Sequence, residues 1–264
     1  IMKKTILLFS ALLIFGNLSA QDKAALVNPI IGTNGMGHTF PGACVPFGLV
    51  QLSPDTDTIP HNVDGKYQPR AYEYCAGYQH KDSSIVGFSH THFSGTGHSD
   101  LGDILIMPAT GELKLNPGTA TDPDGGYRSR FSHDTEVSRP GYYEVMLADY
   151  GVKAQLTATK RVGVHKYTFP KEAKNQRIIL DMIHGIYNYD GKVLWTNIRV
   201  ENDTLVTGYR ITNGWARTNY TYFAMSFSKP ITHYGCEEKA KVNYRGGYAK
   251  FNMKENFPDI GGRK

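Results

Sequence analysis

A glycine-rich stretch from Gly87 to Met107, GFSHTHFSGTGHSDLGDILIM, gathers side chains that could do chemistry. Its imidazoles and carboxylates can transfer protons, bind a metal or hydrogen-bond a polar ligand, and its glycines let a ligand approach the backbone closely. Apolar runs flank the polar centre on both sides, which is how a site is mounted on a rigid scaffold. The titratable residues of the stretch are His90, His92, His98, Asp100 and Asp103.

The spacing of the first two histidines leaves three interpretations open. In an extended segment, side chains two residues apart share a face, so His90 and His92 would point the same way. Two imidazoles on one face could bind a metal, contact a ligand such as a sugar, or brace the loop through internal hydrogen bonds. The intervals to His98 and the two aspartates fit no established ligand spacing. We therefore assign no metal ligand in this chain.

Composition narrows the class of protein. The 264 residues are 40% hydrophobic, 12% aromatic and 20% charged, so the chain could form one large all-β domain or two smaller ones and can bury a substantial core. The formal net charge is +5, but the basic residues are scattered rather than clustered, which argues against nucleic-acid binding. Three cysteines, Cys44, Cys75 and Cys236, leave at least one thiol unpaired and do not decide whether a disulfide forms.

The N-terminus has the pattern of a secretory signal peptide over residues 1–20. Lys3 and Lys4 precede an apolar run from Ile6 to Gly16, and small residues lead to a cleavage point after Ala20. The apolar run is shorter than the ~20 residues that a spanning helix needs. We expect a periplasmic or secreted protein that has no membrane association after cleavage.

The rest of the chain predicts strands. No segment keeps a helical period, and short runs rich in β-branched and aromatic residues alternate with Gly, Pro and Asn turns, which favours an antiparallel β-sandwich. The turn at Asp149-Tyr150-Gly151 predicts a hairpin within Tyr142–Phe169, and Arg177–Ile183 reads as a strand covered on both faces. Further strands are predicted at Gly48–Leu52, Thr204–Thr212, Thr221–Phe227 and Gly247–Met253.

Two other segments suggest ligand contact. Tyr72, Tyr74 and Tyr78 would share one face of an extended segment, where they could stack on sugar rings or pack against the core. The loop from Gly32 to His38, GTNGMGH, resembles a phosphate cradle only superficially, because no Lys-Ser/Thr pair and no helix follow it. We therefore do not assign nucleotide binding.

Three long segments together resemble glycoside hydrolase family 92. They are NPIIGTNGMGHTFPGACVPFGLVQLSPDT, GYQHKDSSIVGFSHTHFSGTGHSDLGDILIMP and GYYEVMLADYGVKAQLTATKRVGVHKYTF. The resemblance begins near Val27, keeps the order of the family's motifs and continues to the end of the chain. Members of this family are secreted, exo-acting α-mannosidases.

The resemblance implies a two-domain enzyme. Members pack an N-terminal β-sandwich on a larger C-terminal (α/α)6 barrel, depend on calcium and invert the anomeric centre. The catalytic carboxylates and most calcium contacts lie in the barrel. On this basis residues 21–264 are the N-terminal sandwich, truncated at its C-terminus, and the barrel of the same polypeptide is its partner. We assign no catalytic residue here and expect calcium to be bound mainly by the domain missing from this chain.

What this chain would contribute is part of the pocket wall around a terminal α-mannoside, in particular an α-1,2-linked one. The family often has tryptophan where Tyr74 or Tyr72 stands. The alternative is a stand-alone carbohydrate-binding or structural sandwich without hydrolytic activity. The residues that match family motifs near the domain junction, and that we expect to bind substrate, are Gly32, Thr33, His38, Tyr74, Cys75, His90 and His92.

Overall fold

The computed structural model describes residues 23–57, 59–60, 62–189 and 191–235, together with the backbone of 247–251 and 258–262. The expected signal peptide and Cys236 lie outside the described residues. Within the described part, no helix is long and apolar enough to cross a membrane.

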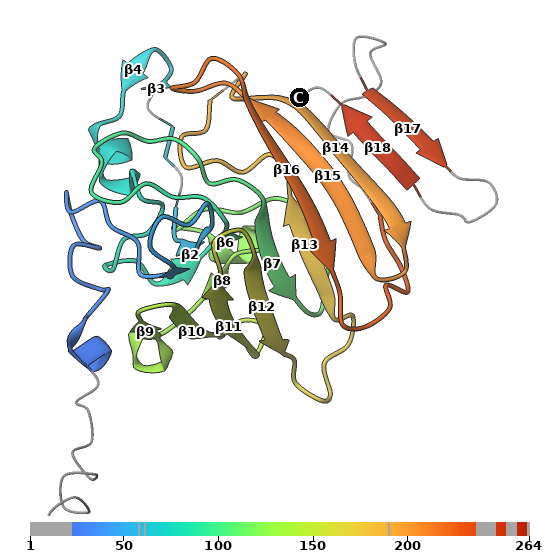
Figure 1. Ribbon diagram of the computed structural model, residues 1–264, viewed down its shortest axis with the longest axis horizontal. Helices are drawn as coiled ribbons and strands as arrows, with labels where there is room; N and C mark the ends of the chain where they lie inside the picture. The colour runs from blue at the N-terminus through green and yellow to red at the C-terminus, as the bar shows by residue number, and fades with distance from the viewer. Residues whose placement is uncertain are drawn as a thin grey trace, which may run out of the picture.

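Antiparallel strands are the main regular structure of the described chain, and they form three larger sheets and two small ones (Figure 1). The first sheet has the order β1-β2-β6-β7-β13, the second β12-β11-β10-β9 and the third β16-β15-β14-β18-β17. The strands of the first sheet are β1 (Ala43–Cys44), β2 (Gln51–Asp55), β6 (Gly87–Ser89), β7 (Leu105–Ala109) and β13 (Arg177–Asp181). Those of the second are β9 (Val137–Arg139), β10 (Tyr142–Leu147), β11 (Val152–Ala158) and β12 (Gly163–Thr168). Those of the third are β14 (Val193–Asn202), β15 (Leu205–Thr212), β16 (Asn219–Ser226), β17 (Gly247–Phe251) and β18 (Pro258–Gly262).

Short elements complete the fold around these sheets. The small sheets pair β3 (Asn62–Val63) with β4 (Lys66–Tyr67), and β5 (Ser84–Ile85) with β8 (Ser129–Arg130). The 3-10 helices are η1 (Lys23–Leu26), η2 (Pro69–Tyr74), η3 (Pro123–Gly125) and η4 (His133–Thr135).

The first and second sheets face each other as a β-sandwich. Phe88 and Met107 from the first sheet share one buried cluster with Val145 and Leu156 from the second. Burying each large apolar side chain stabilises the fold by about 1.5–3 kcal/mol. β6 and β7 are neighbours in the first sheet, so the polar loop between them, residues 90–104, is held at both ends by core strands.

The predicted hairpin is confirmed. β10 and β11 pair from Tyr142 with Thr157 to Leu147 with Val152, and Gly151 supplies the positive φ of the turn at +62°. Along β10 buried residues alternate with partly exposed ones, as the sequence pattern requires. β15 and β16 also form where the sequence predicts strands.

Two predicted strands differ from the structure. β13 forms, but it lies at the edge of its sheet and only Ile179 is buried, so it is not covered on both faces. The strand expected over Gly48–Leu52 begins only at Gln51, because Phe47 has a positive φ of 58° and Gly48 closes a turn onto Val45. The predicted strand therefore begins three residues before the observed one.

The tyrosine segment is also not extended. Residues 69–74 form the 3-10 helix η2, which Pro69 starts at its first position. Such a helix has three residues per turn, so Tyr72 and Tyr74 point to different sides. Tyr72 is 38% exposed, whereas Tyr74 and Tyr78 are buried at 1%. The expected common face of three tyrosines is therefore wrong.

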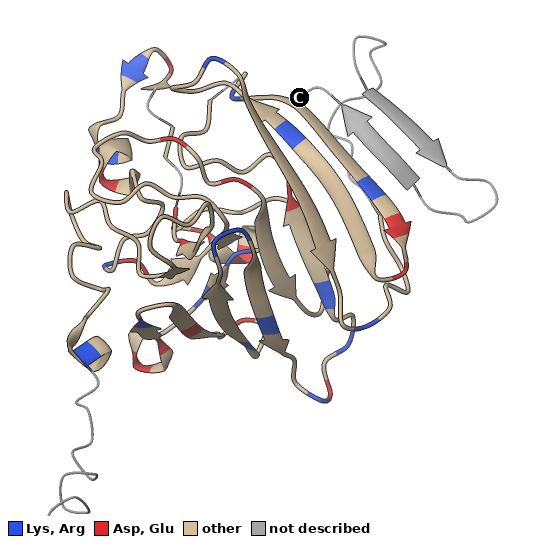
Figure 2. Ribbon diagram, viewed as in Figure 1, with Lys and Arg blue, Asp and Glu red and all other residues tan. Residues whose placement is uncertain are grey.

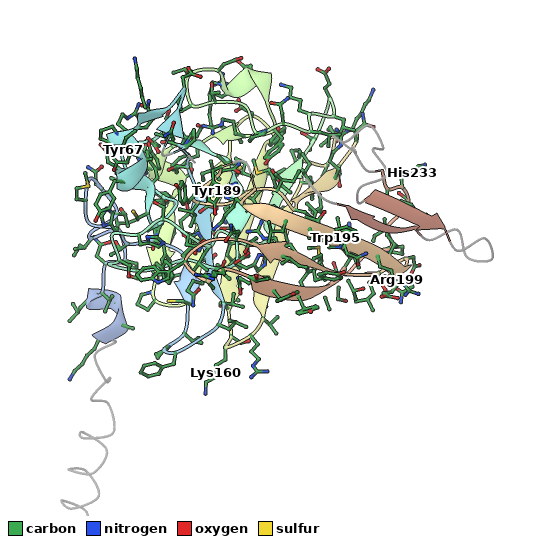
Figure 3. The ribbon with its side chains drawn as sticks, turned by 90° about the horizontal axis from the view of Figure 1, so that it is seen from above. Tyr67, Lys160, Tyr189, Trp195, Arg199 and His233 are labelled. Atoms are coloured by element: carbon green, nitrogen blue, oxygen red, sulfur yellow. The ribbon has the colours of Figure 1, made fainter. Side chains whose placement is uncertain are left out.

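Charged residues are spread over loops and strands without a basic stripe (Figure 2). The third sheet presents its outer face to solvent, and Arg199 on β14 lies at that surface near Trp195 (Figure 3). Along β16 exposed residues alternate with partly buried ones, and Phe223, Met225 and Phe227 fall on the less exposed face.

Candidate pocket wall and its support

The loop from Gly32 to His38 is closed so tightly that glycine is required in it. Gly32 has a φ of +84°, and a Cβ there would lie 2.8 Å from the hydroxyl of Thr39. A Cβ on Gly37 would lie 2.1 Å from the Gly32 carbonyl oxygen. Side chains at either position would force the loop open.

Contacts from the following segment fix the loop in place. The side chain of Gln79 accepts a hydrogen bond from the Gly35 amide at 2.8 Å and donates one to the Gly35 carbonyl at 3.0 Å. The His80 amide donates to the Thr33 carbonyl at 2.9 Å. Thr33 is only 1% exposed and its hydroxyl donates to Ile30 at 2.7 Å, so it supports the loop from inside.

His38 sits at the point where three segments meet. Its φ is 54°, its ring packs edge-on against Tyr72 at 4.9 Å between centroids, and its carbonyl accepts from the Gly95 amide at 2.6 Å. A Cβ on Gly97 would lie 1.9 Å from the Tyr72 hydroxyl. His38 Nε2 is buried and has no hydrogen-bond partner among the described residues. The glycine loop, Tyr72 and the 94–97 turn thus form one continuous surface.

Tyr74 and Cys75 lie behind this surface. Both are buried, at 1% and 0% exposure. The Tyr74 hydroxyl donates to Asp82 at 3.1 Å, and burial, with the Asp82 charge beside it, raises the pKa of this phenol. The Cys75 thiol contacts the Ser99 hydroxyl at 3.2 Å, and burial raises the thiol pKa. Neither side chain reaches the outer surface of the domain.

His92 belongs to a buried aspartate network. Its Nδ1 donates to the Gln51 carbonyl at 2.7 Å, and its Nε2 lies 2.8 Å from Asp55. His184 approaches the other carboxylate oxygen at 2.7 Å. Burial alone would raise the pKa of Asp55, but the two imidazoles outweigh it and hold the pKa well below its ordinary value. Gly77 makes room for the carboxylate, because a Cβ there would lie 2.1 Å from it.

His90 belongs to a different network. Its Nδ1 donates to the Ile104 carbonyl at 2.7 Å, which leaves Nε2 to accept from His165 Nε2 at 3.0 Å. The other nitrogen of His165 accepts from the Tyr167 hydroxyl at 2.7 Å. Burial lowers the pKa of both imidazoles, and the pKa of His165 falls well below its ordinary value. The two hydrogen-bonded imidazoles are therefore neutral. Both loop histidines are therefore occupied by internal hydrogen bonds, as the bracing interpretation expects.

The two loop aspartates pair with residues of the third sheet and the segment before it. Asp103 accepts from Arg210 Nε at 2.7 Å and from the Thr91 hydroxyl at 2.7 Å. Asp100 pairs with the buried Lys192. For each aspartate, burial would raise the pKa, but the partners outweigh it and lower the pKa.

A cavity of about 300 Å3 opens beside these pairs, with Trp215 and Asn219 in its lining. Trp215 is 68% exposed. Sequence reasoning missed Lys192, Arg210 and Trp215. The only sequence signal for them was indirect: if Asp100 and Asp103 are buried, each carboxylate needs a partner from elsewhere in the chain.

Comparison with known proteins identifies the family. The sequence model of the glycosyl hydrolase family 92 N-terminal domain matches residues 26–258. The chain belongs to glycosyl hydrolase family 92.

Solved structures of this family share the fold. A family GH92 α-mannosidase from Bacteroides thetaiotaomicron in complex with mannoimidazole superposes with a TM-score of 0.74 and 41% sequence identity, over 91% of this chain and 30% of that one. A second structure of that α-mannosidase gives a TM-score of 0.73 at 41% identity, over 91% and 31%. An uncharacterized secreted glycosidase of Arthroderma benhamiae is 30% identical over 158 residues, which are 56% of this chain and 18% of the relative. This chain therefore spans less than a third of the length of these relatives.

Three buried carboxylates of this GH92 domain have nitrogen partners rather than the oxygen-rich surroundings of a calcium ion. Calcium takes six to eight oxygen ligands. The buried carboxylates of Asp55, Asp100 and Asp103 are each paired with histidine, lysine or arginine instead. The same pairing lowers the pKa values of all three carboxyl groups, so they do not carry the proton that a general acid needs.

Proposed function

We propose that this chain is the N-terminal β-sandwich of an exo-acting α-mannosidase that removes terminal mannose, in particular α-1,2-linked mannose, from glycans. The observation that carries the proposal is 41% identity, over 91% of this chain, to a GH92 α-mannosidase solved with mannoimidazole. Activity belongs to the full-length polypeptide, in which the sandwich packs against a C-terminal helical domain.

The part of this chain that we assign to substrate is the surface made by the Gly32–His38 loop, Tyr72 and the 94–97 turn. Tyr72 presents an exposed ring that can stack on the C–H face of a sugar. His38, whose buried Nε2 has no partner among the described residues, packs edge-on against this ring. Gly95 and Gly97 leave backbone exposed beside them. Thr33, Tyr74, Cys75, His90 and His92 act from behind as supports.

The carboxylates that act on the glycosidic bond are supplied from outside this chain. An inverting glycosidase needs a protonated carboxyl group at the leaving oxygen and a carboxylate that activates water on the opposite face, roughly 6.5–9.5 Å apart. The buried aspartates described above are committed to histidine, lysine and arginine partners. The role of this chain is to orient the sugar and to limit the approach of bulk water.

Calcium dependence and export are further parts of the proposal. The calcium ion would be held mainly by the rest of the polypeptide, because Asp55, Asp100 and Asp103 are paired within this chain. The pattern of residues 1–20 and the secreted glycosidase relative support a periplasmic or secreted enzyme.

Proton NMR of the products tests the proposal. The full-length polypeptide is incubated with α-1,2-mannobiose, and the first mannose released is expected to be the β-anomer, with α-mannose appearing later by mutarotation. α-Mannose first would overturn inversion, and absence of any mannose release would overturn the mannosidase assignment. Activity that survives exhaustive chelation would remove the calcium part alone.

A further inference from the structure

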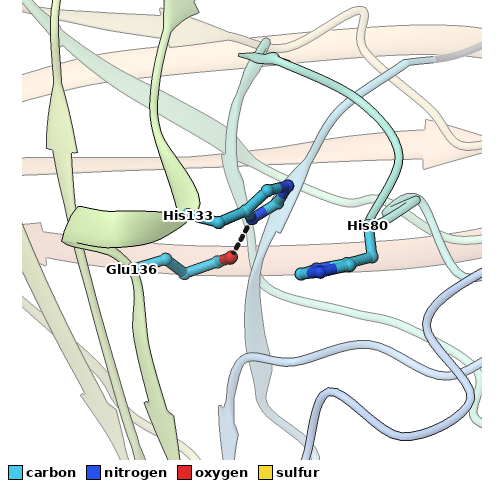
Figure 4. Close-up of side chains that lie close together, drawn as sticks. All are labelled: His80, His133 and Glu136. Carbon is cyan, nitrogen blue, oxygen red and sulfur yellow. Dashed lines mark hydrogen bonds and ion pairs between the residues drawn. The ribbon is translucent and has the colours of Figure 1, made fainter.

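A second group of metal-binding side chains lies away from the Asp55 and Asp103 networks. His80, His133 and Glu136 each direct one ligand atom to a common point, and these atoms all lie within 4.8 Å of one another. Figure 4 shows the three side chains converging, with His80 on the loop after η2 and the other two on η4 and the residue that ends it.

The backbone explains why His133 and Glu136 share a side. A 3-10 turn has three residues per turn, so positions i and i+3 lie above one another. The Glu136 amide closes the turn by donating to the His133 carbonyl at 3.1 Å, and His133 Nδ1 lies 2.6 Å from Glu136 Oε2. The Ser132 hydroxyl caps the turn by accepting from the Asp134 amide at 3.2 Å.

The carboxylate is oriented in the way that metal-binding carboxylates are. Its side chain is only 3% exposed, and the hydroxyls of Tyr78 and Tyr143 donate to Oε1 at 2.9 and 2.7 Å. Hydrogen bonds of this kind fix the direction of a ligating oxygen. The second oxygen, Oε2, lies 3.0 Å from the Tyr78 hydroxyl and 2.6 Å from His133 Nδ1.

The two imidazoles are close enough to share an ion. Their ring centroids are 3.9 Å apart with 34° between the ring planes. An imidazole binds a metal ion through the lone pair of one ring nitrogen. Ligand atoms around a tetrahedral zinc ion lie roughly 3.4 Å apart, given metal–ligand bonds of about 2.0–2.2 Å. His133 is partly exposed, so its ring can rotate and move Nδ1, now 2.6 Å from Glu136 Oε2, to the spacing of two zinc ligands.

We propose that His80, His133 and Glu136 form a divalent transition-metal site of the zinc class. Two imidazole nitrogens and one carboxylate oxygen are a zinc donor set, with a fourth position for water. Imidazole ligands also suit nickel, cobalt and copper, while calcium prefers oxygen ligands. The ion would tie η4 to the segment that anchors the glycine loop, because the His80 amide holds the Thr33 carbonyl and Gln79 holds Gly35.

Metal titration of the full-length polypeptide tests this site. The protein is stripped with a chelator and returned to a calcium-containing buffer, so that any oxygen-ligand site is filled, and is then titrated with Co2+. We expect one equivalent to bind with the visible absorption bands of a cobalt–imidazole complex. Saturating Zn2+ should raise the melting temperature, because an ion that binds only the folded state stabilises it.

Variants locate the binding. His133→Ala removes a partly exposed ligand and should weaken Co2+ binding at least tenfold while the protein stays folded, as judged by its circular dichroism. His80→Ala should have the same effect. The control is His233→Ala, which removes an exposed histidine at the far end of the molecule (Figure 3) and should bind Co2+ as the native protein does. Absence of the visible bands, or equal affinity in all three variants and the native protein, would overturn the proposal.

Discussion

The glycine loop and the region behind it use similar polar residues in opposite ways. Behind the loop, the carboxylates of Asp55 and Asp103 are buried, and histidine and arginine side chains of this chain already hydrogen-bond them. At the glycine loop, His38 keeps a buried ring nitrogen without a partner among the described residues, and the neighbouring Tyr72 leaves its ring partly exposed. A buried group with its partners in place stabilises the fold, whereas one left open is available to a ligand.

This contrast separates two kinds of histidine that the sequence presents alike. His90 and His92 lie in the motif that first suggests chemistry, yet both rings are occupied by internal hydrogen bonds. His38 lies at the end of the glycine loop and has a ring nitrogen without a partner among the described residues. A high density of titratable residues in this sequence therefore indicates the side chains that support the site as much as those on its surface.

The largest effect should come from breaking the buried ion pair. Arg210 is 0% exposed and also donates to the His184 and Met182 carbonyls. Arg210→Met keeps much of the side-chain volume but leaves the Asp103 carboxylate buried without its cation. Removing one partner of such a pair typically costs about 3–5 kcal/mol. We expect a loss of that size in the free energy of unfolding of the full-length protein, measured by urea denaturation.

The matched control is Arg199→Met, which removes an exposed arginine whose partner, Glu201, is also partly exposed. Surface pairs contribute about 0–1 kcal/mol. A double variant, Asp103→Asn with Arg210→Met, should recover part of the loss because the uncompensated charge is gone. Equal losses for Arg210→Met and Arg199→Met would show that the Asp103 network is not a structural one.

The next effect should appear in activity rather than stability. Tyr72→Ala removes the exposed ring from the proposed sugar-binding surface, and His38→Ala removes the unpartnered nitrogen beside it. We expect each to lower kcat/KM on an α-mannoside by about 10–100-fold, which corresponds to ~1.4–2.7 kcal/mol of lost transition-state binding.

Tyr220→Ala on β16 controls for the loss of an exposed tyrosine, since Tyr220 is 55% exposed. It should leave kcat/KM unchanged. Both site variants should keep a melting temperature close to that of the native protein. A fall in melting temperature with near-normal turnover per folded molecule would instead place Tyr72 and His38 among the supports.

Local features of the fold could be predicted from the sequence because their causes are local. The β10–β11 hairpin follows from alternating residues on either side of the turn at Gly151. The polar loop between β6 and β7 follows from glycine and histidine between apolar runs. In contrast, Asp103 and Arg210 are separated by 107 positions, and no local pattern indicates that they meet.

The site was harder to predict for two physical reasons. Alternation of Tyr72, Tyr74 and Tyr78 fits a strand, but Pro69 starts a 3-10 turn that sends Tyr72 outward and Tyr74 inward. His90 and His92 lie beyond the end of β6 at Ser89, so the two-residue period no longer fixes their direction. Burial and partners, which depend on the whole fold, decide what each side chain does.

The smallest effect concerns the neutral histidine chain, and its sign follows from the pKa shifts. Burial lowers the pKa of His90 and His165 in the folded state from an ordinary 6.5, so the unfolded chain binds more protons once the pH drops below about 6.5. Stability is therefore fully present above pH 6.5 and is lost as the pH falls, by at most ~1.4 kcal/mol per pH unit for each histidine. The buried aspartates lose their contribution only below their ordinary pKa of 3.8, so the two effects occupy separate pH ranges.

His165→Gln keeps an amide that can donate and accept but cannot titrate. We expect it to flatten the slope of unfolding free energy against pH between about 6.5 and 4.5, while His233→Gln, at an exposed position, keeps the native slope. Identical slopes in the His165→Gln variant and the native protein would contradict a buried, neutral His90–His165 pair.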